Sequence, residues 1–339
     1  MKNYNVAVVG ATGMVGSKFL EVLTEKKLPV ANYFLFASSK SAGKVIDFMG
    51  KPHTVIELTE ENVKSHKIDI ALFSAGGSTS AKFAPVFAAC GAKVIDNSSQ
   101  WRMDPTVPLV VPEVNPEDID WNKGIIANPN CSTIQAMLPL KALDQKYGIK
   151  RIIYSTYQAV SGAGVAGFTD LDEGIKAYAN GTNYATKKFP YPIVNNCIPH
   201  IDVFLPNGYT KEEEKMIKET KKILHNDNMK ITATTVRVPV LNSHSESINV
   251  EFFKPCTKDG IVEALKNMKG IVVVDDVANN KYPMPIDSTG HDEVFVGRIR
   301  IDDTVDSGCN LWVVADNIRK GAASNAVQIA EYMIANNKI

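Results

Sequence analysis

The sequence predicts an α/β protein with two domains: an N-terminal Rossmann-type doubly wound sheet and a second α+β domain with a mostly antiparallel sheet. Three observations lead to this expectation. The 339 residues exceed what a single hydrophobic core usually organises. Strands and helices alternate up to about residue 131, as in parallel sheets, and long strands dominate afterwards. We expect the first domain at residues 1–131, the second at 132–316, and the last helical segment, 317–339, to return to the first.

The chain begins with an apolar strand, Val6–Val9, that runs into a G-x-x-G-x-x-G turn and an amphipathic helix. Gly10 permits the tight turn, Gly13 lets the backbone approach a pyrophosphate, and Gly16 allows close packing of helix on strand. The pattern predicts a dinucleotide site, with a tight βα turn without ligand as the alternative. Further candidate contacts in the turn are Thr12, Met14 and Val15.

The second strand, Tyr33–Ala37, ends where the adenosine ribose of such a cofactor lies. An NAD enzyme usually has Asp or Glu there, and this chain has neither. The loop instead offers hydroxyls and cations suited to a 2'-phosphate, namely Ser38, Ser41 and Lys44. The sequence therefore favours NADP over NAD.

The next strand, Ile68–Phe73, ends in a Ser/Gly-rich turn that opens a helix reaching Ala89, and a further strand follows at Ala92–Asp96. Ligands of doubly wound sheets bind at the carboxyl ends of the strands. We therefore count Ser74, Gly76 and Thr79 of this turn among the cofactor contacts.

Cys131 is the candidate nucleophile. Gly124–Pro129 reads as a short buried strand and a turn, and an apolar helical face begins after Asn130. A thiol at a helix N-terminus feels the positive end of the macrodipole, which favours the thiolate. A buried structural cysteine is the alternative. Next to a nicotinamide, such a thiolate would form a thiohemiacetal with an aldehyde, lose hydride to NADP, and pass the resulting acyl group to water or phosphate.

The second domain combines long strands with two helices and one long loop. The expected strands are Arg151–Val160, Ile231–Val238, Ser247–Phe253, Glu293–Ile301 and Leu311–Ala315, and the expected helices are Lys211–His225 and Asp259–Met268. Asn180–Pro206 reads as a long ordered loop, and such loops tend to be functional or to form interfaces.

Two residues of this domain are candidates for catalysis beside the cysteine. Gln158 ends the first long strand, ahead of a segment that we expect to be a flexible Gly-rich loop, and its amide could hold a water or the substrate carbonyl. His244 could act as general acid/base because an imidazole titrates near working pH. The alternatives are a buried strand-end Gln and a solvated loop His. Ser161 and Gly162 in the Gly-rich segment, and Asn317 before the last helix, are candidate cofactor contacts.

The composition of the chain argues against several classes of binding partner. Lys plus Arg equals Asp plus Glu at 37 each, without a basic block, so neither nucleic acid nor membrane is expected. A strand begins after four residues, and no uncharged apolar run approaches transmembrane length, so we expect a cytoplasmic protein. The five cysteines are odd in number and scattered, which argues against a disulfide framework and against a zinc site; no metal is expected.

These motifs together resemble the bacterial aspartate-semialdehyde dehydrogenases, over nearly the whole chain and in order. The matching stretches are Gly10–Gly16, Ser98–Arg102, Asn128–Thr133, Gln158–Gly164, Glu212–Lys215 and Arg237–Val240 with His244. Trp101 departs from the smaller aromatic residue expected there. The Asn-Cys-Ser-Thr element with the Arg/His pair is the specific part of the resemblance.

The resemblance implies roles for the site residues. Cys131 would be the nucleophile, His244 the acid/base, and Gln158 a positioning residue that also contacts substrate. Arg237 and Glu212 would bind the carboxylate and amino ends of the substrate. A planar guanidinium suits the carboxylate of a zwitterion, and an acidic side chain suits its ammonium group. Arg102, Asn130 and Lys215 would bind phosphate. An ordinary ion pair on a helix face is the alternative for Glu212 and Lys215.

The resemblance also implies a reaction. It is the NADPH-dependent conversion of L-4-aspartyl phosphate to L-aspartate 4-semialdehyde and inorganic phosphate, for lysine, threonine and methionine synthesis, by a homodimer or homotetramer whose second domain is catalytic and forms the dimer. N-acetyl-gamma-glutamyl-phosphate reductase shares the scaffold but usually has an aromatic residue after its cysteine, where this chain has Ser132. A nucleotide-sensing regulator without catalysis is a third possibility, which an intact Cys131, Gln158 and His244 disfavour.

Overall fold

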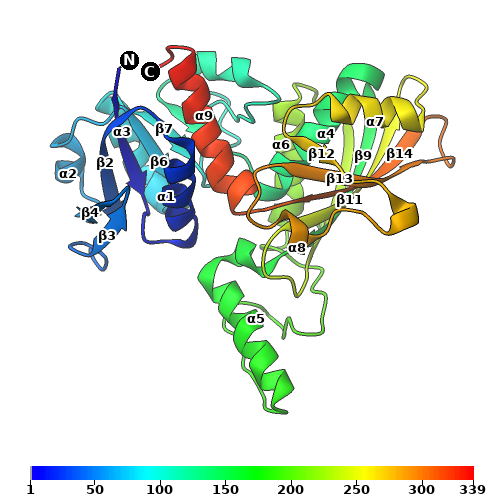
Figure 1. The fold of residues 1–339 in the computed structure, drawn as a ribbon, viewed down its shortest axis with the longest axis horizontal. Coiled ribbons are helices and arrows are strands. Elements are labelled where there is room, and N and C mark those ends of the chain that lie inside the picture. The colour runs from blue at the N-terminus through cyan, green and yellow to red at the C-terminus, as the bar shows by residue number, and fades with distance from the viewer. Residues whose placement is uncertain (1) are drawn as a thin grey trace. The chain divides into compact units, whose positions relative to one another are not determined.

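The computed structural model describes residues 2–339 of the chain (Figure 1). They form two compact units. Unit 1 comprises Met1–Asn130 and Ala322–Ile339, and unit 2 comprises Cys131–Gly321. Among the described residues, no helix is both long enough and apolar enough to span a bilayer.

Unit 1 is built on a six-stranded sheet in the order β5-β2-β1-β6-β7-β8. All of these pairings are parallel, which confirms the predicted doubly wound sheet. The strands are β1 (Tyr4–Val9), β2 (Val30–Ala37), β5 (Ile56–Glu57), β6 (Ile70–Phe73), β7 (Lys93–Asp96) and β8 (Ile125–Ala127), and a hairpin of β3 (Val45–Phe48) and β4 (Lys51–Thr54) contacts β2. The helices are α1 (Met14–Lys26), α2 (Glu60–Lys64), α3 (Gly77–Ala89), the 3-10 helix η1 (Pro116–Trp121) and α9 (Ser324–Ala335).

Both faces of this sheet are buried, which explains why β1 is apolar at successive positions. Val6 and Val8 belong to a core cluster shared with α1 and α9. Ala7 and Val9 belong to a second cluster, on the side of α3. The C-terminal helix α9 thus completes the cover on one face of the sheet in unit 1.

Unit 2 contains a second six-stranded sheet in the order β10-β9-β11-β14-β13-β12. The β10–β9 and β12–β13 pairs are parallel and the other three are antiparallel, so the sheet is mostly antiparallel, as predicted. Its strands are β9 (Ile149–Gln158), β10 (Lys230–Arg237), β11 (His244–Phe252), β12 (Ile271–Val273), β13 (Val294–Ile301) and β14 (Gly308–Ala315). The helices are α4 (Cys131–Tyr147), η2 (Val160–Ala163), α5 (Gly164–Ala179), α6 (Lys211–Ile223), α7 (Lys258–Lys266), η3 (Val277–Asn279) and α8 (Pro285–Ser288), and a π-helical turn, η4 (Arg319–Ala323), leads into α9.

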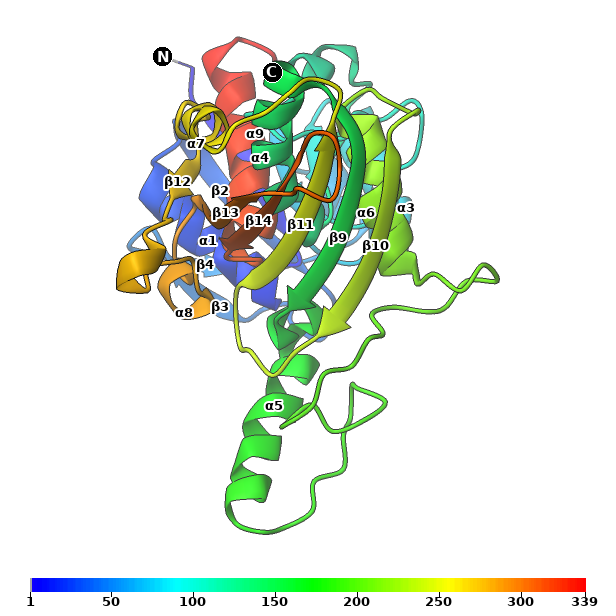
Figure 2. The same cartoon turned by 90° about the vertical axis from the view of Figure 1, so that its right-hand side faces the viewer.

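Helices α4, α6 and α7 pack on one face of this sheet, and Figure 2 shows β9, β10 and β11 side by side in front of α4 and α6. Alternate residues of β11 reflect this arrangement, since Ile248, Val250 and Phe252 are buried beneath the helices while Ser247 and Asn249 are only half-buried. The opposite face carries no comparable helical layer in the part of the chain described.

The segment after Gln158 differs from its prediction. We expected a flexible Gly-rich loop up to Gly164, but Val160–Ala163 forms η2. The helix that follows, α5 (Gly164–Ala179), was not predicted, and it extends away from the sheet of unit 2 (Figure 1). The loop prediction was wrong because Gly162 serves close packing and not flexibility: a Cβ there would lie 2.9 Å from Arg237 Nη1. Gly167 and Gly174 of α5 also allow close packing, since a Cβ on Gly167 would lie 2.6 Å from the carbonyl oxygen of Val160 and one on Gly174 would lie 2.9 Å from Val194.

Candidate active site

Cys131 is the first residue of α4, directly after the strand β8 and the turn Asn128–Asn130. The side chain of Asn128, in unit 1, holds this turn in place. Its Nδ2 donates to Asn97 Oδ1 (2.8 Å) and to the carbonyl of Ala322 (3.0 Å), and its Oδ1 accepts from Asn325 Nδ2 (2.7 Å). This amide network therefore fixes the turn within unit 1.

Cys131 lies beside His244, with Sγ 3.3 Å from Nε2. The imidazole is fully buried, and its Nδ1 accepts a hydrogen bond from the backbone N–H of Ala159 (3.0 Å). Because Nδ1 is an acceptor, the proton of the neutral ring is on Nε2 and points to the sulfur. Burial, together with the positive charge of Arg237, lowers the pKa of His244 to about 3. The ring is thus a neutral hydrogen-bond donor to Cys131.

A polar cluster adjoins this pair. Gln158 Nε2 donates to Glu212 Oε1 (3.1 Å), and all three of Gln158, Glu212 and Arg237 are buried. Gln158 and Arg237 are register partners at the ends of β9 and β10, which explains why residues 79 positions apart meet. The Thr156 hydroxyl donates to Gln158 Oε1 (3.0 Å), so the amide group of Gln158 has a fixed orientation.

Two glycines make this close packing possible. A Cβ on Gly162 would lie 2.9 Å from Arg237 Nη1 and 3.2 Å from His244 Nε2, so this predicted cofactor residue also lies against Arg237 and His244. A Cβ on Gly321 would lie 2.9 Å from the Cβ of Cys131. Sequence reasoning missed Gly321, and no local pattern signals it, because its role depends on a chain crossing 190 positions from the cysteine.

The candidate phosphate-binding residues are found in both units. In unit 1, Arg102 is buried, and its Nε and Nη2 donate to the carbonyls of Asn128 and Asn97, both at 2.9 Å. Asn130 is buried at the end of unit 1. In unit 2, Lys215 forms ion pairs with Asp202 (2.8 Å) and Glu212 (3.1 Å). These ion pairs raise the pKa of Lys215 against the opposing effect of burial.

The predicted cofactor loops of unit 1 meet at the carboxyl edge of its sheet. Gly10 has a φ of 87°, and a Cβ there would lie 2.3 Å from the carbonyl oxygen of Ser74, so the two loops need a glycine at their contact. A Cβ on Gly16 would lie 2.0 Å from the oxygen of Gly10. At the N-cap of α1, Gly13 supplies no side-chain hydrogen bond. This turn therefore fits a dinucleotide, whose pyrophosphate would cap the helix.

The loop after β2 continues this edge. Ser38 and Lys44 are exposed, and the hydroxyl of Thr12 donates to Ser41 Oγ (3.3 Å), which joins the glycine turn to the predicted 2'-phosphate loop. Gly76 is the N-cap of α3, with Thr79 in its first turn. In unit 2, Asn317 Oδ1 accepts from the N–H of Ser243 (2.9 Å) and Asn317 Nδ2 lies 3.0 Å from the Ser161 hydroxyl, so these two candidate cofactor residues are neighbours.

Fold and site define the class of protein, an oxidoreductase with a Rossmann-type NAD(P)-binding domain and a cysteine held next to a histidine at a helix N-terminus. Residues 5–122 match the family model described as semialdehyde dehydrogenase, NAD binding domain, and residues 140–320 match semialdehyde dehydrogenase, dimerisation domain. Among curated proteins, the chain is 58% identical to the aspartate-semialdehyde dehydrogenase of Aquifex aeolicus, over 98% of each. It is 51% identical to that of Campylobacter jejuni, over 97% of each. The chain belongs to the aspartate-semialdehyde dehydrogenase family.

Solved structures agree with this assignment. Aspartate semialdehyde dehydrogenase II of Vibrio cholerae, complexed with ASA, superposes with a TM-score of 0.95 at 47% identity, covering 99% of both chains. The Candida albicans enzyme, solved with NADP, has a TM-score of 0.78 at 27% identity, covering 100% of both chains.

The geometry predicts that His244 acts on Cys131 as a hydrogen-bond donor and not as an imidazolium. Because burial and Arg237 lower the pKa of His244 to about 3, the ring is neutral above about pH 4 and should add no step of its own to the pH dependence of thiol reactivity. The rate of Cys131 alkylation by iodoacetamide should therefore rise in one step. His244→Ala should move this step to higher pH, whereas His244→Gln, which keeps an amide donor, should move it less. A second step near pH 6.5 that both variants lack would contradict this assignment.

Proposed function

We propose that this protein reduces L-4-aspartyl phosphate to L-aspartate 4-semialdehyde with NADPH, releasing inorganic phosphate, as a cytoplasmic step of lysine, threonine and methionine synthesis. The observation that carries the proposal is the Cys131–His244 pair, with its 3.3 Å separation at the N-terminus of α4, beside the buried Arg237 and Glu212. The relatives named above support it. None of the five cysteines forms a disulfide, which fits the reducing environment of a cytoplasm.

The substrate is a zwitterion, and the site offers a group for each end. The guanidinium of Arg237 would bind the α-carboxylate, because a planar fork matches two carboxylate oxygens. The carboxylate of Glu212 would bind the α-ammonium. Gln158, which already donates to Glu212 Oε1 (3.1 Å), would orient the acyl group between them. We assign phosphate binding to Arg102, Asn130 and Lys215.

The chemistry would begin with attack of the Cys131 thiolate on the acyl carbon. As negative charge develops on the acyl oxygen, this oxygen would accept a hydrogen bond from the Nε2–H of His244. The attack forms a C–S bond, and the C–O bond to phosphate then breaks. The departing phosphate takes up one proton from solvent. When bound, NADPH supplies the hydride that reduces the acyl group. Breaking the C–S bond finally returns the electron pair to Cys131 and frees the aldehyde, so a neutral His244 is sufficient.

We assign cofactor binding to Gly10, Thr12, Gly13, Met14, Val15, Ser38, Ser41, Lys44, Ser74, Gly76 and Thr79 of unit 1 and to Ser161, Gly162 and Asn317 of unit 2. The preference for the 2'-phosphate would come from the loop after β2, where exposed hydroxyls and Lys44 occupy the place of the acid of NAD enzymes.

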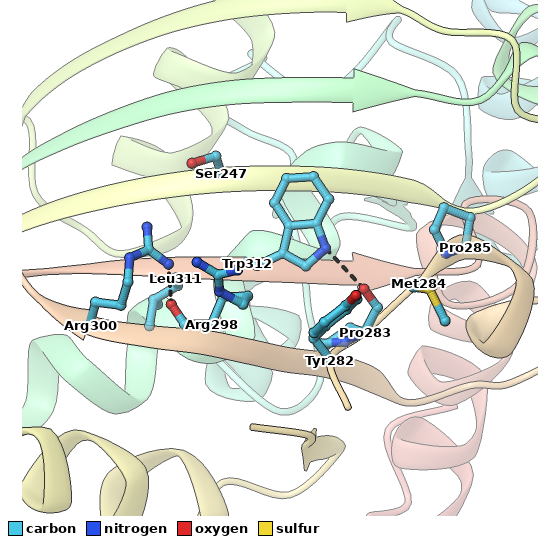
Figure 3. A pocket seen from close by; sticks show the side chains of 9 residues that line it. All are labelled: Ser247, Tyr282, Pro283, Met284, Pro285, Arg298, Arg300, Leu311 and Trp312. Carbon is cyan, nitrogen blue, oxygen red and sulfur yellow. Dashed lines mark hydrogen bonds between the residues drawn. The ribbon is translucent and has the colours of Figure 1, made fainter. Parts of the chain in front are cut away.

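We further propose that the enzyme is a homodimer or a homotetramer, joined through the face of the unit 2 sheet that lies opposite α4, α6 and α7. Tyr157 is 39% exposed on this face, and its ring centroid lies 5.4 Å from that of Trp312. Figure 3 shows Trp312 beside Tyr282, Arg298 and Arg300 in a pocket of this face. Aromatic and arginine side chains are enriched in such interfaces. The matching family model, described as a dimerisation domain, covers this sheet.

The activity is tested by NADPH formation from L-aspartate semialdehyde, phosphate and NADP, with the N-acetyl-glutamate semialdehyde analogue as the control substrate. Only the aspartate compound should turn over efficiently. Turnover of the N-acetylated compound alone would show that the protein is the related reductase.

The role of Arg237 is tested with Arg237→Lys, which keeps the charge but loses the planar guanidinium. This variant should raise the KM for the semialdehyde by about tenfold or more.

The cofactor preference is tested with Ser38→Asp, which adds a negative charge where the 2'-phosphate would lie. The NADP/NAD ratio of kcat/KM should fall by about tenfold or more, because charge-assisted contacts are replaced by repulsion. Ser65→Asp adds the same charge to unit 1 outside the loop and should leave the ratio unchanged. Equal ratios for the two variants would exclude the loop from the site.

The interface is tested with Trp312→Glu, whose carboxylate would be buried without a partner between two copies. Mass photometry should find dimers or tetramers of the native chain and monomers of this variant. Trp121→Glu in unit 1 replaces another half-exposed tryptophan, 42% exposed, and should retain the native oligomer. A Trp312→Glu protein that also retains it would place the interface elsewhere.

A further inference from the structure

Phe189 lies over the guanidinium of Arg237. The distance from Arg237 Cζ to the centroid of the ring is 6.0 Å, within the range of a cation–π contact. Phe189 belongs to the segment that follows α5, which has no regular secondary structure and runs back toward the carboxyl ends of β9 and β10 (Figure 2). A bridge between Ile198 and Arg237 ties the same segment to the end of β10.

The ring of Phe189 is held by packing. It contacts the small apolar cluster of Val160, Leu171, Ile193 and Ile198, and it is itself only partly buried. On the α5 side, a Cβ added to Gly167 would lie 3.2 Å from the ring tip, so a glycine at this position leaves room for the ring.

The backbone of Phe189 is held by Asp170 of α5, whose side chain is 1% exposed. The carboxylate accepts hydrogen bonds from the N–H groups of Lys187 (2.9 Å), Lys188 (2.8 Å) and Phe189 (3.1 Å), and from the Tyr184 hydroxyl (3.0 Å). Burial alone would raise the pKa of Asp170, but these donors hold it below its usual value. One buried carboxylate therefore fixes the turn that carries the ring.

Arg237 is restrained on two sides by these contacts. Its Nη1 donates to the carbonyl of Ala159 (2.6 Å), which fixes one edge of the guanidinium, and the Phe189 ring covers a face. Gly162 lies against the same Nη1, where a Cβ would come within 2.9 Å. With Arg237 5% exposed, little freedom is left for the plane of the fork.

We propose that Phe189 is a positioning residue for Arg237, and that Asp170 acts through it by ordering residues 187–189. The ring sets the plane of the guanidinium so that its remaining N–H edge meets the substrate carboxylate in two parallel hydrogen bonds. This inference rests on the substrate-binding role proposed above for Arg237. It makes Phe189 a determinant of affinity for the carboxylate end of the substrate, although it does not touch the reacting atoms.

The test compares Phe189→Leu with Phe189→Tyr in steady-state kinetics. Leu keeps an apolar side chain but has no ring face, so the KM for the semialdehyde should rise about three- to tenfold while kcat changes less than about twofold. Tyr keeps the face and should retain the native KM. The KM values for phosphate and NADP should not change, because neither ligand uses Arg237. A native semialdehyde KM in Phe189→Leu, or an equal rise in all three KM values, would overturn the inference.

A fluorinated series tests the same contact in a protein that keeps its aromatic ring and therefore its packing. Mono-, di- and trifluorophenylalanine at position 189 weaken the negative face of the ring in steps. The semialdehyde KM should rise stepwise with fluorination; a constant KM would overturn the inference. Asp170→Asn should raise the same KM and no other. Arg237→Lys distinguishes a failure of the role proposed for Arg237 from a failure of the role proposed for Phe189. If Arg237→Lys leaves the semialdehyde KM unchanged, the role of Arg237 is wrong. If Arg237→Lys raises this KM but Phe189→Leu does not, only the role of Phe189 is wrong.

Discussion

The hydrogen bond from the Ala159 N–H to His244 Nδ1, 3.0 Å long, determines how the whole site works. It leaves the imidazole only one end, Nε2–H, to offer to Cys131. Burial and Arg237 keep the ring neutral, so the sulfur faces a donor and not a competing base. In the mechanism proposed here the thiolate and the acyl oxygen in turn accept this hydrogen bond, and the ring carries no proton away.

That hydrogen bond depends on the order of strands in unit 2. β9 lies between β10, which is parallel to it, and β11, which is antiparallel. The ends of β9 and β10 therefore meet the start of β11 at one edge of the sheet, and Gln158, Arg237 and His244 are the residues at those positions. The same edge receives the N-terminus of α4 through the contact of Cys131 with His244. Cys131, Gln158, Arg237 and His244 lie far apart in the sequence, so they come together only when these four elements of unit 2 have assembled.

The sequence predicted those features that local patterns encode. The apolar run Val6–Val9 and the glycines after it predicted a parallel sheet and a nucleotide turn. Cys131 could be placed at a helix start from the strand and turn before it and the apolar helical face after it. Features that depend on distant contacts were not predicted. The segment up to Gly164 was expected to be a flexible loop because it is rich in glycine, and the helix Gly164–Ala179 that follows it was not predicted; its glycines serve packing within unit 2. The proximity of Phe189 to Arg237, and of Gly321 to Cys131, arises only when the chain folds, and neither residue stands out in its own stretch of sequence.

The central claim, that Cys131 carries the acyl group while a neutral His244 only donates a hydrogen bond, is tested most directly by trapping the adduct. The enzyme would be mixed with L-4-aspartyl phosphate without NADPH, quenched in acid and analysed by intact-mass and peptide mass spectrometry. The account predicts one aspartyl group on Cys131, formed by the native enzyme and, more slowly, by His244→Gln, and absent from Cys131→Ser. An adduct on another residue, or none in His244→Gln while the native enzyme is fully acylated, would contradict it.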